Sequence, residues 1–94
     1  MQRLGPDETE LHGRRVEIDG QVLRDPVSLR IDWLVGSELI ALATADGGWS
    51  TLYRDPVDSR YWELTYLQSE MHGGGPRTLL LMDSATARAK YEVP

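Results

Sequence analysis

Alternating apolar and polar residues mark several short strands along the chain. The clearest turn signal, Asp19-Gly20, lies between two alternating stretches, so Arg15–Arg24 is predicted to form a β-hairpin. Four more strands are predicted at Glu38–Thr44, Trp49–Arg54, Tyr61–Leu67 and Thr78–Met82. The last of them is apolar almost throughout, which is typical of a central strand buried on both faces.

Two helices are predicted from their start signals. Asp25-Pro26 combines an N-cap residue with a proline at the first helical position, and Gly36 marks the end. The apolar face of this helix consists of Val27, Ile31, Leu34 and Val35. Residues 26–35 also alternate with period two, so a strand is the alternative there, and we favour the helix. Asp83-Ser84 starts a second helix that runs through Tyr91.

Together these elements predict an α+β fold, with a mainly antiparallel β-sheet and two short helices packed on it. We expect a single domain over residues 1–94, in which the polar and acidic residues 1–10 are most prone to fraying. Thr78–Met82 should lie beside Tyr61–Leu67, with the last helix on one face of the sheet. The chain has no phenylalanine, so its core is expected to centre on Trp33, Trp49 and Trp62. An exposed tryptophan would instead mark a binding site.

Composition narrows the possible functions. There is no cysteine, which excludes disulfides and thiolate catalysis, and His12 and His72 show no metal-ligand spacing, so no metal or other cofactor is expected. No apolar run spans a membrane or forms a signal peptide, so a cytoplasmic location is expected. A formal net charge of −5 argues against direct nucleic-acid binding. The acidity either serves solubility, the simpler explanation, or steers the chain toward a basic partner.

The segment His72-Gly73-Gly74-Gly75 spells the oxyanion-hole motif of some esterases. That fold also needs a G-x-S-x-G turn, and neither Ser37 nor Ser50 has the flanking glycines. A phosphate-binding loop is not favoured either, because Pro76, Arg77 and a strand follow in place of a helix. Two interpretations of the three glycines remain. They adopt positive φ angles, or they let a partner approach the backbone closely.

Glu63 is the one carboxylate in the most strand-like segment. Alternation places Trp62, Leu64 and Tyr66 on one face, and Tyr61, Glu63 and Thr65 on the other. If the second face is covered, Glu63 needs a partner such as Arg60 or Arg77; if it is open, the carboxylate is available for recognition. Catalysis would require a second titratable group nearby, for which Glu70 and His72 are the candidates.

A family resemblance covers nearly the whole chain. It is carried by Trp49, Leu52-Tyr53, Asp55-Pro56, Arg60-Tyr61-Trp62-Glu63, Tyr66, Ser69-Glu70 and His72-Gly73-Gly74-Gly75-Pro76. Further matches are Glu10-Leu11, Gly13, Arg30-Ile31, Trp33-Leu34 and Lys90-Tyr91. In this order and spacing the chain resembles immunity protein family 27 of bacterial polymorphic-toxin systems. It departs from the family pattern at Ser59, where glycine is expected, and at Leu67 and Arg77, where prolines are expected.

The resemblance implies a non-catalytic antidote that is encoded beside a toxin and binds it in the cytoplasm. We expect the toxin to contact the loop from Ser69 to Arg77 and an open strand face beside it. The predicted partner-binding residues are Glu63, Glu70, His72, Gly73, Gly74, Gly75 and Arg77. The carboxylates would suit a nuclease, whose arginines and lysines bind nucleic acid. No cofactor, metal or membrane contact is implied, and the chain should be a monomer or a weak dimer. The alternative is a small ligand-binding domain or enzyme that uses Glu63, Glu70 and His72.

Overall fold

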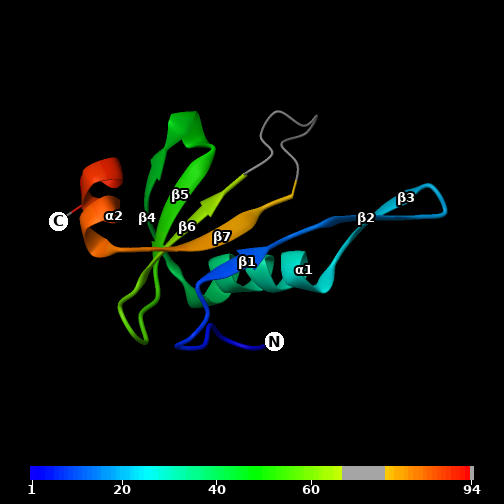
Figure 1. The fold of residues 1–94 in the computed structure, drawn as a ribbon, viewed down its shortest axis with the longest axis horizontal. Helices are drawn as coiled ribbons and strands as arrows, with labels where there is room; N and C mark the ends of the chain where they lie inside the picture. Colours follow the sequence, from blue (N-terminus) through cyan, green and yellow to red (C-terminus); the bar gives the residue numbers. More distant parts are fainter. Residues whose placement is uncertain (67–75, 94) are drawn as a thin grey trace.

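The chain folds around a five-stranded antiparallel sheet with a helix on each face (Figure 1). The structure is a computed structural model that describes residues 1–66 and 76–93. The sheet order is β1-β7-β6-β5-β4. The strands are β1 (Glu10–His12), β4 (Ile40–Ala45), β5 (Ser50–Arg54), β6 (Tyr61–Thr65) and β7 (Thr78–Met82). The predicted α+β class is therefore confirmed.

The central strand is β6, and β7 lies beside it as predicted, with Tyr61 opposite Met82 and Thr65 opposite Thr78. The expectation that β7 is buried on both faces is correct for Thr78 and Leu79 and wrong for the rest of the strand, where Leu81 is 37% exposed and its neighbours are only partly buried. Beyond β7 lies β1, which the sequence did not predict. Three residues are too few to show a strand period, and β1 is fixed by its pairing with β7.

The first helix forms where the capping signals place it and then continues further than predicted. In α1 (Pro26–Trp33), the Asp25 carboxylate accepts a hydrogen bond from the Ser28 amide at 2.7 Å. Gly36 does not end the helical segment, since a π-helical turn η1 (Leu34–Glu38) follows directly. Glycine costs only about 1 kcal/mol inside a helix, and the packing of Leu34 in the core offsets that cost.

The second helix, α2 (Ser84–Tyr91), begins as predicted, with Asp83 accepting a hydrogen bond from the Thr86 amide at 2.7 Å. It packs on the face of the sheet opposite α1, and Figure 1 shows it beside β4. The core is accordingly divided by the sheet. On the α1 side it comprises Leu4, Leu11, Ile31, Leu34, Leu39, Trp62, Leu64 and Leu79. On the α2 side it comprises Leu52, Ala87 and Tyr91.

The prediction that all three tryptophans centre the core is correct for Trp62 alone. Trp62 is fully buried, Trp33 packs against the core from the side, and Trp49 is 51% exposed. The exposed fraction of Trp49 places it among the residues that could contact a partner.

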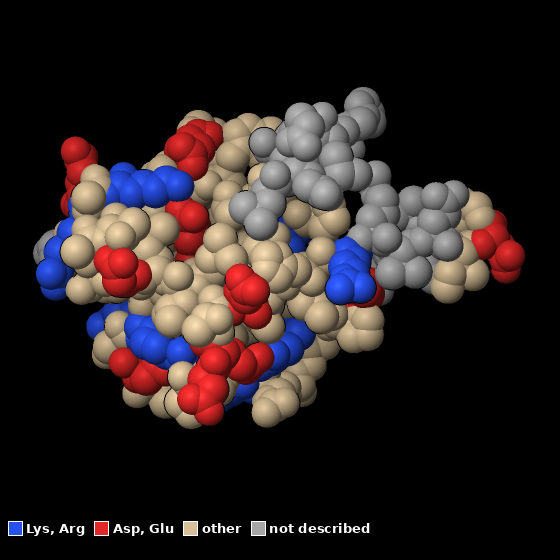
Figure 2. Space-filling model, in the orientation of Figure 1, with Lys and Arg blue, Asp and Glu red and all other residues tan. Residues whose placement is uncertain are grey.

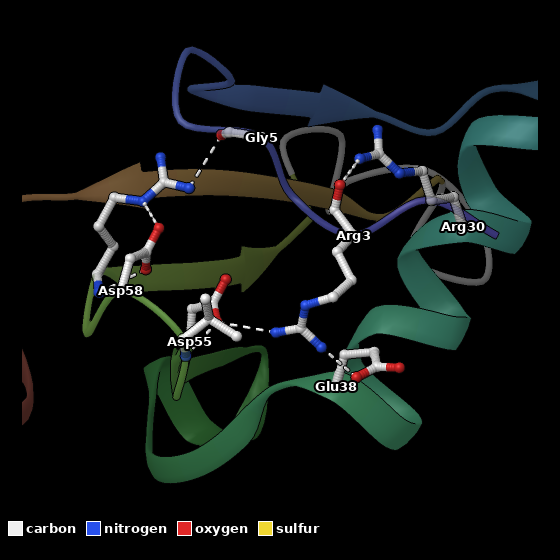
Figure 3. A network of polar contacts seen from close by, with 8 residues as sticks. Arg3, Gly5, Arg30, Glu38, Asp55 and Asp58 are labelled. Carbon is white, nitrogen blue, oxygen red and sulfur yellow. Dashed lines mark hydrogen bonds and ion pairs between the residues drawn. The ribbon is translucent and has the colours of Figure 1, made fainter.

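The N-terminal segment is held by a set of arginines rather than by its own secondary structure (Figure 3). Arg3 forms ion pairs with Glu38 and Asp55, which joins the segment to η1 and to the end of β5. Arg30 of α1 donates two hydrogen bonds of 2.7 Å to the Glu8 carboxylate and a third to the Arg3 carbonyl. The bidentate contact lowers the pKa of Glu8 from 4.5 to about 2. Residues 1–10, expected to fray most readily, thus make specific contacts with the body.

The predicted hairpin is confirmed and forms a separate two-stranded sheet of β2 (Arg15–Ile18) and β3 (Gln21–Arg24). Its turn residues Asp19 and Gly20 have φ angles of 53° and 77°, and an Asp-Gly pair tolerates such values. Figure 1 shows this ribbon projecting from the body, which explains the 47 Å long axis of the molecule.

Candidate partner-binding surface

Glu63, the predicted recognition residue, lies on a covered face of the sheet. Its side chain is 9% exposed, and the Tyr91 hydroxyl donates a hydrogen bond of 2.6 Å to the carboxylate. The Lys90 ammonium forms an ion pair with the same oxygen at 2.7 Å. The expectation of an open face at Glu63 is therefore wrong, because α2 brings both partners over the carboxylate. Its partners are also neither Arg60 nor Arg77, the two that the sequence suggested.

The Glu63 contacts continue into a polar network at the end of α2. Lys90 also pairs with Asp46 at 3.2 Å, and the Ser50 hydroxyl donates to that same Asp46 carboxylate at 2.9 Å. The hydrogen bond with Glu63 raises the pKa of the Lys90 ammonium, and burial followed by the Glu63 contact raises the pKa of the Tyr91 hydroxyl. Both groups hold their protons at neutral pH even without these shifts. The higher pKa values reflect the contact with Glu63 at Lys90, and burial together with that contact at Tyr91. The network therefore fixes α2 on the sheet with its donors and acceptors matched.

Arg77, another predicted site residue, is also engaged within the chain. It forms an ion pair with Asp32 of α1. Its backbone carbonyl accepts a hydrogen bond from the Gly13 amide at 2.9 Å. A Cβ at Gly13 would lie 2.8 Å from that carbonyl oxygen and 2.5 Å from the Ser28 hydroxyl, so only glycine fits there. These contacts join the start of β7 to β1 and α1.

The other predicted partner-binding residues lie outside the described residues. They are Glu70, His72, Gly73, Gly74 and Gly75. The alternative constellation of Glu63 with Glu70 and His72 lies partly outside them as well. The described part of the predicted site thus consists of Glu63 and Arg77, both paired internally.

A group of aromatic side chains on the α1 side of the sheet is only partly covered. Trp49 immediately precedes β5, and its ring meets that of Tyr66 edge to face, with centroids 5.4 Å apart and planes at 89°. Tyr53 is half-buried on the same face, where it lies opposite Trp62 in the ladder. Burial, together with the neighbouring Tyr66, raises the pKa of the Tyr53 phenol. Trp49 and Tyr66 therefore lie beside Tyr53, which itself packs against the edge of the core on the α1 side.

Strand β4 extends this group to the edge of the sheet. The register shifts between Ala41 and Ala43, so Leu42 is an extra residue in a β-bulge, and it is 39% exposed. Alternation from Ala43, which packs on the α2 side, places Leu42 on the opposite face. Thr44 pairs with Thr51 on that face. We call the resulting area the aromatic surface, defined by Leu42, Thr44, Trp49, Thr51, Tyr53 and Tyr66.

None of the six described residues that define the aromatic surface is charged, whereas 27% of the chain is charged. The ends of β4 are flanked by Glu38 and Asp46, and each has a basic partner, Arg3 and Lys90. Elsewhere, Figure 2 shows acidic and basic side chains interspersed across the face in view. An uncharged aromatic centre with charged residues at its border is the usual composition of a protein–protein contact.

Sequence reasoning missed the aromatic surface because it assigned Trp49 to the core. The available signal was the position of Trp49 directly after the turn Asp46-Gly47-Gly48, at the end of a strand rather than inside it. Tyr66 holds the equivalent position at the end of β6. Aromatic residues at strand ends are covered only if another element reaches that far.

Two further observations concern metal binding and membrane spanning by the described residues. None of the His, Asp and Glu side chains described here gathers in a group of three that could hold a metal ion. None of the described helices is both long enough and apolar enough to cross a membrane.

Comparison with known proteins identifies the family. The family described as Immunity protein 27 matches residues 17–83, more than two thirds of the chain. No curated protein and no solved structure matches. The matched range contains the first helix, strands β4 to β7 and all six residues of the aromatic surface. The chain therefore belongs to the immunity protein 27 family.

Proposed function

We propose that this chain neutralises a cognate toxin domain by binding it, without catalysing a reaction. The observation that carries the proposal is family membership over residues 17–83. The exposed Trp49 ring and its contact with the partly buried Tyr66 ring support it, because tryptophan and tyrosine are enriched at the centres of protein interfaces. We place the encounter in the bacterial cytoplasm, where a toxin made beside its antidote would otherwise act.

A nuclease is the toxin class that we favour. The net charge of −5 would raise the association rate with a basic protein, and nucleases need basic surfaces to hold nucleic acid. The acidic groups act here through the long-range field, since Glu63 is buried and paired with Lys90. We propose that the chain acts as a monomer or weak dimer and does not bind nucleic acid itself.

Co-expression with the neighbouring toxin gene tests the proposal. Cells that express the toxin domain alone should stop growing, and cells that also express this chain should grow. Equal killing with and without the chain would overturn the immunity function. Nucleic-acid degradation in the unprotected cells would support the nuclease assignment, and intact nucleic acid in dying cells would contradict it.

A further inference from the structure

We propose that the toxin docks on the aromatic surface through an uncharged patch of its own, centred on Trp49. This inference rests on the proposed function and adds where the partner binds and by what chemistry. It differs from the carboxylate-based contact that the sequence suggested. The described part of that predicted site, Glu63 and Arg77, is engaged by Lys90, Tyr91 and Asp32 within the chain.

The geometry of the aromatic surface suits contact with another protein. Trp49 is held edge-on by Tyr66 at 5.4 Å, so its ring orientation is fixed before a partner arrives. Tyrosine and tryptophan lose little side-chain entropy on binding, because each has only two rotatable bonds. A preformed pair of rings can therefore act as a rigid anchor for an apolar partner group.

The polar groups of this surface are hydroxyls rather than charges. Thr44 and Thr51 lie opposite each other beside the rings, and Tyr53 adds a phenol that is neutral at pH 7. Neutral hydroxyls can donate to or accept from a partner's backbone and cost less to desolvate than carboxylates. This surface is consequently matched to a partner patch that is apolar and neutral, and its described residues offer no positive charge to phosphate groups.

Beside the surface, β4 is the last strand of the sheet, and its exposed residues include Ile40 at 43% and Leu42 at 39%. Six uncharged residues in a row form this strand. Edge strands that are free of partners usually carry charge to prevent association. The absence of charge along β4 extends the proposed contact from Trp49 to the edge of the sheet.

The test uses the isolated C-terminal toxin domain encoded by the neighbouring gene, inactivated by mutation, and this chain at full length. Trp49→Ala removes the anchor ring, and Leu42→Arg places a charge in the uncharged area. Val57→Arg is the matched control, because Val57 is 74% exposed and lies in the β5–β6 connection, at the other end of β5 from Trp49 (Figure 1). Binding is measured by calorimetry, and folding of each variant by its thermal melt.

We expect Trp49→Ala and Leu42→Arg each to weaken binding at least about tenfold, with Val57→Arg within about twofold of the unmodified chain. Dissociation of the unmodified complex should change by less than about threefold between roughly 0.1 and 1 M salt, because charge mainly affects association. If all three variants bind alike, or if dissociation accelerates strongly with salt, the docking site is wrong while the proposed function stands.

Failure of the unmodified chain to bind the toxin domain would overturn the proposed function and this inference together. A second copy of the chain is the competing occupant. Sedimentation of the chain alone detects it: concentration-dependent dimers that disappear in Trp49→Ala would assign the surface to self-association and overturn docking of the toxin there.

Discussion

Trp62 and Trp49 occupy the same side of one sheet, and only one of them is covered. Trp62 lies in the middle of β6, is fully buried and has the Arg60 guanidinium 5.1 Å from the centre of its ring. Trp49 lies at the end of β5 and is 51% exposed. The difference comes from α1 and from the N-terminal segment, which cover one part of this face and leave the other open.

The position of α1 explains why the cover is partial. Helix α1 contacts β1 at one edge of the sheet, whereas Trp49 lies at the end of β5, next to β4 at the other edge. Helix α1 therefore does not cover the part of this face that carries Trp49. The covered part stabilises the fold, and the open part is available for a partner.

The largest expected effect on stability comes from a substitution in the covered part of the sheet, at Trp62. Trp62→Ala should destabilise the protein by about 3–5 kcal/mol, since it leaves a large cavity among the core leucines. Urea unfolding of the purified variant measures the loss. Trp62→Phe should cost less, because it leaves a smaller cavity and removes an indole N–H that has no acceptor among the described residues. A cost below about 1 kcal/mol for Trp62→Ala would show that this ring does not support the core.

Glu63 extends the comparison to the opposite face, which α2 covers. Glu63→Ala should destabilise by about 1–3 kcal/mol, because the Tyr91 hydroxyl loses its acceptor in a buried position. Lys90 is 34% exposed and retains Asp46 and water, so its loss adds little. Thermal melts of Glu63→Ala and Glu63→Gln measure the effect, and the glutamine variant should recover part of the stability by accepting from Tyr91.

The same pair of variants separates a structural role from recognition. Glu63→Gln should bind the toxin domain as tightly as the unmodified chain, since the carboxylate lies beneath α2. A specific loss of toxin binding with an unchanged melt would restore the recognition role that the sequence suggested.

The secondary structure could largely be predicted from the sequence. Which parts of the sheet the helices cover could not be predicted. Alternation and turn residues located the hairpin and four strands, and Asp25 and Asp83 located both helix starts, because these signals are local. Whether Trp49 or Glu63 is covered depends on how far a helix from elsewhere in the chain reaches. Neither residue carries that information in its neighbours, so the sequence placed one in the core and the other on an open face.

The pH dependence of stability tests the ion pair between Arg30 and Glu8, which holds the N-terminal segment against α1. Arg30 lowers the pKa of Glu8 from 4.5 to about 2, so the charged carboxylate is favoured in the folded chain. Its contribution to stability is fully present above pH 4.5 and is lost as the pH falls through the window from 4.5 to about 2. Glu8→Gln should lower the melting temperature at pH 7 and flatten its decline within that window. Parallel pH profiles for both proteins would show that the pair does not stabilise the fold.

The smallest expected effect on stability is at Trp49. This substitution tests the comparison of Trp49 with Trp62 most directly. Trp49→Ala should cost about 1 kcal/mol or less, because the ring is half-exposed and loses mainly its edge-to-face contact with Tyr66. Urea unfolding under the conditions used for Trp62→Ala provides the measurement. With equal chemistry removed at both sites, a difference of about 2 kcal/mol or more between the variants would follow from the coverage by α1 and the N-terminal segment. If Trp49→Ala instead unfolds the chain as readily as Trp62→Ala, the open area contributes to the core, and the aromatic surface is not free to bind a partner.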